Sequence, residues 1–213
     1  MGEWVQVRGP DGTFKAYVAR PNGTPKAAVV VVQEIFGVNA VIRGKADWLA
    51  REGYLAVAPD LFWRIKHGIE LTDRTQDEWK KALGYMDQLN KNASVKDVQA
   101  TLTWARSQGV RKAGVMGYCM GGYIAFLAAA RTDTDATVAY HGGGIHTALN
   151  EARDIKKPVM LHNPLEDSFI PREALDQIRE TLKSNPLAIV HEYAGLDHAF
   201  TREGGKHYDQ AGT

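Results

Sequence analysis

Residues 113–122 read Ala113-Gly114-Val115-Met116-Gly117-Tyr118-Cys119-Met120-Gly121-Gly122, and a strongly apolar segment follows to Ala130. This pattern predicts a buried strand, a sharp turn and a helix. The turn has the form G-x-C-x-G-G, a nucleophile elbow with cysteine in place of serine. Its central residue is strained, and side chains two positions away would collide with it, which accounts for Gly117 and Gly121. Because the helix dipole favours a thiolate at that point, we predict that Cys119 is a nucleophile.

Two other interpretations of this segment are weaker. A lone cysteine is commonly a small buried hydrophobic residue, but not between spaced glycines at a strand-to-helix turn. A glycine-rich turn can also bind phosphate. The chain lacks both G-x-G-x-x-G and the Gly-Lys-Ser/Thr ending of a P-loop, so phosphate binding is disfavoured.

Outside the elbow, short apolar runs alternate with amphipathic segments. We expect strands at 27–32, 54–58, 113–116, 137–140, 158–161 and 188–191, and helices after Asn39, at 76–89, 93–107, 123–130 and 171–184, with a short one at 147–153. Ser94 resembles a helix cap. Strands that are apolar on both faces indicate a mostly parallel central sheet with helices on both faces, and residues 3–20 fit an antiparallel hairpin at its edge. We predict one α/β domain over residues 1–213.

Composition excludes several function classes. The 213 residues are 44% hydrophobic and 24% charged, with a net charge of +1. This balance gives no footprint for nucleic acid or a membrane surface, and no apolar run is long enough to span a bilayer. We see no secretory signal, and the single cysteine excludes an intramolecular disulfide. We therefore expect a cytoplasmic monomer that acts on a small molecule and needs no metal or organic cofactor.

A thiol nucleophile needs a base, and His198 is the histidine that follows the last predicted strand through a glycine-containing loop. His141 also follows a strand, but we interpret its His-Gly-Gly-Gly string as a structural loop beside the site. The acid should follow the strand at 158–161. We choose Asp167 there, and Glu166 remains the alternative.

With these three residues placed, the chain resembles the dienelactone hydrolase family of α/β-hydrolases over nearly its whole length. The resemblance is carried by four motifs, which are Gln33-Glu34-Ile35-Phe36-Gly37, Ala58-Pro59-Asp60-Leu61-Phe62, Gly117-Tyr118-Cys119-Met120-Gly121-Gly122 and Gly195-Leu196-Asp197-His198-Ala199-Phe200. The α/β-hydrolase fold is what this resemblance implies. Family members usually continue into a final helix, which we expect to be reduced or missing here.

The resemblance also implies further site residues. Glu34 matches a carboxylate that contacts the resting cysteine, and the backbone N–H groups of Ile35 and Met120 match the oxyanion hole. Arg202 matches an arginine that binds the substrate's carboxylate. A second such arginine would fall at or next to Trp79, so the chain departs from the family there. Phe36 and Trp79 are the remaining expected substrate contacts.

These residues predict a Cys-His-Asp hydrolase that opens an enol-lactone ester through a thioester intermediate. One alternative is a broader esterase or thioesterase that acts on another small ester. A second is a non-catalytic binding protein that retains the pocket.

Overall fold

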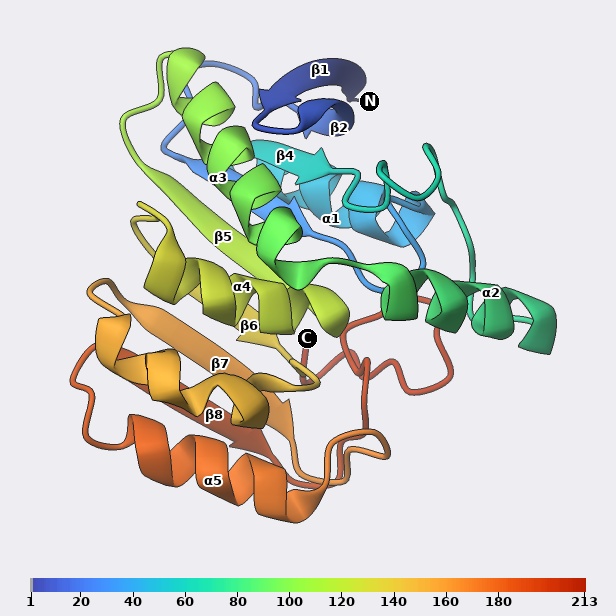
Figure 1. Ribbon diagram of the computed structural model, residues 1–213, viewed down its shortest axis with the longest axis vertical. Helices are drawn as coiled ribbons and strands as arrows, with labels where there is room; N and C mark the ends of the chain where they lie inside the picture. Colours follow the sequence, from blue (N-terminus) through green and yellow to red (C-terminus); the bar gives the residue numbers. More distant parts are fainter. Residues whose placement is uncertain (1) are drawn as a thin grey trace.

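A computed structural model describes residues 2–213, which build one eight-stranded sheet in the order β1-β2-β4-β3-β5-β6-β7-β8 (Figure 1). Its strands are β1 Glu3–Gly9, β2 Gly12–Ala19, β3 Ala28–Val32, β4 Leu55–Pro59, β5 Ala113–Tyr118, β6 Thr137–Tyr140, β7 Val159–Pro164 and β8 Ala188–Tyr193. The helices are α1 Ala40–Arg51, α2 Gln76–Gln88, α3 Lys91–Ser107, α4 Met120–Arg131 and α5 Arg172–Leu182, with a 3₁₀ segment, η1, at Ile145–Asp154.

The sheet is parallel from β4 to β8, and the β1–β2 hairpin joins its edge in antiparallel fashion. This arrangement confirms the predicted α/β-hydrolase type of fold. A large apolar core that includes α3 and α4 lies on one face, and a smaller one built around α1 lies on the other. Figure 1 shows α3, α4 and α5 in front of the sheet and α1 behind it.

Local sequence explains most of these elements. The β-branched segment Ala28–Val32 is almost wholly buried at the centre of the sheet, where parallel strands have both faces covered. Asn39 caps α1 by accepting a hydrogen bond from the N–H of Ile42. The expected cap at Ser94 is wrong, because α3 begins three residues earlier and Asn90 caps it through the N–H of Ala93.

Helix α2 covers little of the core, since Ala82 is its only buried residue. It projects beyond the sheet on the side where the parallel strands end (Figure 1). The carboxyl ends of parallel strands are where α/β proteins place their binding sites. The chain between β4 and α3 therefore supplies a wall for such a site.

No helix within residues 2–213 combines the length and the apolar character that a membrane span requires. Residues 194–213 contain turns and bends and no helix. The short helix expected at 147–153 is a 3₁₀ segment kinked at Ala148.

Candidate active site

Cys119 stands at a strained turn between β5 and α4. Its φ of 54° and ψ of −119° lie outside the regions that residues other than glycine normally occupy. A Cβ atom on Gly117 would overlap the carbonyl oxygen of Gly121, and one on Gly121 would overlap the carbonyl oxygens that end β3. A Cβ on Gly122 would come within 2.5 Å of the carbonyl oxygen of Tyr140. The three glycines therefore let α4 begin directly against the sheet.

His198 and Asp167 meet through two loops that follow β8 and β7. The His198 Nδ1 atom lies 2.8 Å from Asp167 Oδ2 and 3.1 Å from Oδ1. Oδ1 also accepts the N–H groups of Phe169 and Ile170, which fixes the carboxylate. The Asp167 side chain has no exposed surface, whereas Glu166 is exposed. Of the two acids that the sequence left open, Asp167 is the one that contacts His198.

Burial alone would lower the pKa of His198, but its surroundings reverse that effect. The charge of Cys119 has the largest raising effect on this pKa. Hydrogen bonds to Asp167 and Cys119 and the charge of Asp167 add to it. Together they raise the pKa of His198 to about 10. The imidazole therefore favours its protonated form beside the Cys119 sulfur. A protonated imidazole in this place can donate a proton to a reacting group.

Cys119 and His198 open into one cavity of about 500 Å³ between α2, α4 and the loops after β6 and β7. Ile35 and Met120 line the same cavity. Neither of their backbone N–H groups donates to an acceptor within residues 2–213. Two free N–H groups beside a nucleophile are what an oxyanion hole requires.

Comparison with known proteins identifies the family of the chain. The profile of the dienelactone hydrolase family matches residues 14–213. The chain belongs to the dienelactone hydrolase family. Membership places it among the carboxylic ester hydrolases.

Several relatives cover the chain almost completely. A protein from Azospirillum brasilense is 41% identical over 203 residues, which cover 94% of this chain and 88% of the relative. The carboxymethylenebutenolidase of Pseudomonas putida is 36% identical and covers 98% of this chain and 89% of the enzyme. A crystal structure of a Klebsiella pneumoniae protein has a TM-score of 0.87 at 28% identity, covering 100% of this chain and 92% of that chain.

The carboxylate and the arginine that the family resemblance assigned to separate roles bind each other. Arg202 donates Nε–H to Glu34 Oε2 at 2.9 Å and Nη2–H to Oε1 at 2.8 Å. Nη1–H donates to Asp73 Oδ2 at 2.8 Å. Both Glu34 oxygens are therefore turned to Arg202, and the structure does not contain the contact with Cys119 that we expected of Glu34.

Trp79, at or next to which the resemblance puts the family's second arginine, lines the cavity. Its ring lies edge-on to Phe36 at 5.1 Å and stacks on Phe169 at 6.0 Å and 13°. Phe36 is 1% exposed and does not line the cavity, so the expectation that it binds substrate is wrong. It supports Trp79 instead, and it lies 4.9 Å beneath the Arg202 guanidinium.

Three residues of this site were missed or undervalued in the sequence. Asp73 lies in a polar stretch with no motif, and its partner Arg202 is 129 residues away. Phe169 is 61% exposed, and its ring stands 5.0 Å from that of His198. His141 is fully buried, with its ring 4.6 Å from the His198 ring. Of these three residues, only His141 belongs to a recognisable motif, the His-Gly-Gly-Gly string.

Residues 2–213 hold no group of three or more His, Cys, Asp or Glu side chains that is placed to bind a metal ion.

Proposed function

We propose that this dienelactone hydrolase family member opens small carboxylic esters, enol-lactones of the dienelactone type among them, through a Cys119-His198-Asp167 triad and a thioester intermediate. The observation that carries the proposal is the 2.8 Å contact from Asp167 to Nδ1 of His198, beside a cysteine at a nucleophile elbow. Asp167 occupies one ring nitrogen, which leaves the other for the sulfur.

The first half of the reaction forms the thioester. The Cys119 sulfur attacks the ester carbonyl carbon, and the negative charge that develops on the carbonyl oxygen is accepted by the N–H groups of Ile35 and Met120. The C–S bond is then complete, and the bond from the carbonyl carbon to the ester oxygen breaks. The leaving oxygen takes a proton from His198, or an enolate leaving group takes it up at carbon.

The second half releases the acid. His198 accepts a proton from water, whose oxygen attacks the thioester carbonyl, and the C–S bond breaks to return the thiolate. Asp167 stabilises the imidazolium throughout, because it is fixed by two backbone N–H groups as well as by the ring. Since Arg202 occupies both Glu34 oxygens, His198 is the base available to Cys119 in this arrangement.

The test compares wild type with Cys119→Ala and Cys119→Ser on a dienelactone and on phenyl acetate. We expect wild type to hydrolyse at least one of them, with a transient acyl adduct on Cys119 seen by mass spectrometry. The alanine variant should retain its fold by circular dichroism and lose hydrolysis altogether. Hydrolysis by folded Cys119→Ala would refute the nucleophile. A wild-type protein whose Cys119 stays inert to iodoacetamide and to both esters would favour a binding protein.

A further inference from the structure

The cavity wall next to Cys119 presents aromatic and aliphatic side chains. Trp79 and Leu83 of α2 lie on one side, and Phe169 lies next to His198. The indole N–H of Trp79 donates to the carbonyl oxygen of Asp73 at 3.1 Å, so the ring offers a ligand only its apolar surface. Phe169 leaves 61% of its surface exposed at the cavity rim. A large exposed aromatic ring at the mouth of a site gains free energy when a ligand covers it.

The charge that Arg202 can offer to an anionic ligand is small. Arg202 is 8% exposed, and its guanidinium already binds two carboxylates, Glu34 and Asp73. These three side chains carry a net charge of −1, counted as +1 − 1 − 1. A carboxylate of a ligand would have to displace Glu34 or Asp73 from Arg202, or bind beside them and be repelled by their negative charge.

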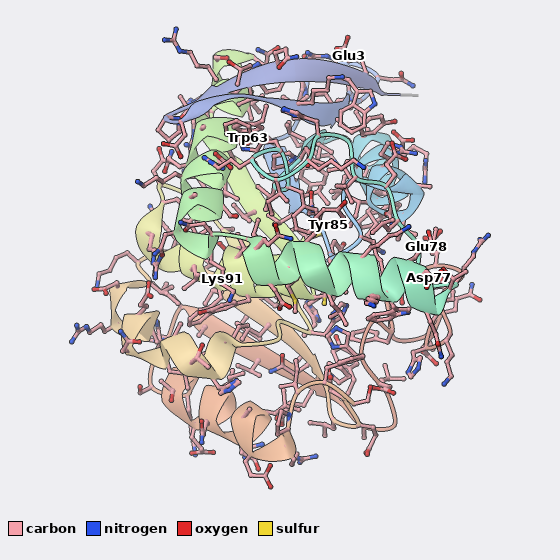
Figure 2. The ribbon with its side chains drawn as sticks, turned by 45° about the vertical axis from the view of Figure 1, so that its right-hand side comes forward. Glu3, Trp63, Asp77, Glu78, Tyr85 and Lys91 are labelled. Atoms are coloured by element: carbon pink, nitrogen blue, oxygen red, sulfur yellow. The ribbon has the colours of Figure 1, made fainter. Side chains whose placement is uncertain are left out.

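Besides Arg202 and His198, Lys91 is the cationic side chain of the cavity lining within residues 2–213. Lys206 lines the adjoining cavity that shares Trp79 and Phe169. Figure 2 shows Lys91 where α2 meets α3, whereas Asp77 and Glu78 lie at the opposite end of α2, beside Trp79 in the sequence. It lies 5.6 Å from the Tyr123 ring, and Asp87 shares the lining with it. Lys91 therefore does not replace the cation that is missing at Trp79.

We propose that the preferred substrates are esters of an uncharged aromatic alcohol or phenol, with the aromatic ring packed against Trp79 and Phe169. Phe169 indicates how the ester is oriented in the cavity. Its ring lies next to that of His198, the group that protonates the leaving oxygen. A phenol leaving group places its own ring on that side. The ester and water become a carboxylic acid and a phenol, and the phenolate oxygen takes the His198 proton. This inference rests on the proposed function.

The test uses a matched pair of aryl esters, 4-acetoxybenzamide and 4-acetoxybenzoate, which differ in the charge of one substituent. We expect wild type to hydrolyse the neutral ester with a kcat/KM at least about tenfold higher. Trp79→Arg should shrink or reverse this preference, because it adds a cation where the cavity wall otherwise presents an aromatic ring. Equal rates, or a preference for the benzoate, would overturn the inference.

A second pair isolates the aromatic contact. Phenyl acetate and vinyl acetate share the acetyl group, and only the first carries a ring. Trp79→Leu should lower the kcat/KM ratio of phenyl to vinyl acetate about threefold to tenfold. Trp48→Leu makes the same change on the exposed side of α1, away from the cavity, and should leave the ratio as in wild type. An unchanged ratio in Trp79→Leu would contradict the stacking.

The two proposals can fail separately. If wild type hydrolyses both aryl esters through Cys119 without preference, the triad stands and the substrate class is wrong. If hydrolysis persists in folded Cys119→Ala, the proposed function itself is wrong.

Discussion

The backbone N–H of Cys119 donates to Nδ1 of His141 at 3.1 Å, and it shares this hydrogen with the carbonyl oxygen of Tyr140, also at 3.1 Å. His141 has a φ of 37° and packs its ring against that of His198. Its Nε2 lies 3.4 Å from the hydroxyl oxygen of Thr201. One neutral imidazole thus contacts both the elbow and the base, so His141 is a positioning residue for the proposed triad.

Replacing His141 should separate this positioning effect from simple packing. Asparagine retains an acceptor near Nδ1 and tolerates a positive φ, whereas leucine does neither. We expect His141→Leu to lower kcat about tenfold, the equivalent of one hydrogen bond, and His141→Asn to recover most of that loss. Steady-state kinetics on folded variants checks this. Equal loss in both variants would mean that His141 only fills space.

Acid should destabilise the protein through the buried His141 and the partly buried His162. Burial, and then the charges of His198, Arg202 and Lys45, lower the pKa of His141 well below its usual value. Burial and the charge of His191 lower the pKa of His162 to about 4. At these two positions the unfolded chain therefore binds protons below about pH 6.5 that the folded chain does not. The contribution of the two groups to stability is full above that pH and falls as the pH drops.

Urea unfolding between pH 4 and 7 measures this loss. Each of the two histidines should contribute a slope approaching about 1.4 kcal/mol per pH unit below pH 6.5. His162→Asn and His141→Asn should each flatten the curve. Variant curves that run parallel to wild type would exclude these histidines as the cause.

Asp167→Asn should preserve the loop and abolish most activity. The amide oxygen can still accept the N–H groups of Phe169 and Ile170, but an amide cannot stabilise the imidazolium. We expect kcat to fall about 10³–10⁴-fold with little change in melting temperature. Glu166→Gln is the matched control, since Glu166 is exposed and should keep wild-type kinetics. The opposite pattern would transfer the acid role to Glu166.

Replacing an elbow glycine by alanine should be harmful, whereas the same replacement in helix α2 should be tolerated. An alanine at Gly121 would overlap the carbonyl oxygens of Val32 and Gln33, which are backbone and cannot move away. Gly121→Ala should therefore reduce both melting temperature and activity. Gly84→Ala in α2 meets nothing within 4 Å and should stabilise by up to about 1 kcal/mol. Thermal unfolding of the two variants decides this.

Arg202→Met should destabilise the fold, because it removes the counter-charge that is hydrogen-bonded to both oxygens of the buried Glu34 carboxylate. The expected cost is about 3–5 kcal/mol in the free energy of unfolding. Adding Glu34→Gln to Arg202→Met should recover part of this cost, because no buried charge then remains at position 34. If Arg202→Met alone costs less than about 1 kcal/mol, the buried ion pair is not holding these loops together.

The sequence alone determined the elbow, the order of strands and helices, the edge hairpin and the positions of Cys119 and His198, and it narrowed the acid to Asp167 or Glu166. These features follow from local patterns. Spaced glycines, β-branched runs and helical periodicity act over a few residues, and the chain order of an α/β sheet fixes where its loops meet.

Only the tertiary structure decided the partners within the site. Glu34 and Arg202 are 168 residues apart and pair with each other, so the carboxylate is turned away from the cysteine. Phe36 is buried and supports Trp79, and Asp73 and Phe169 lie in the site although no sequence motif marks them. Charged groups pair and rings stack only where the fold brings their loops within a few ångströms of one another. A buried charge is costly without a partner, so it pairs with the nearest opposite charge. No spacing along the chain encodes that distance.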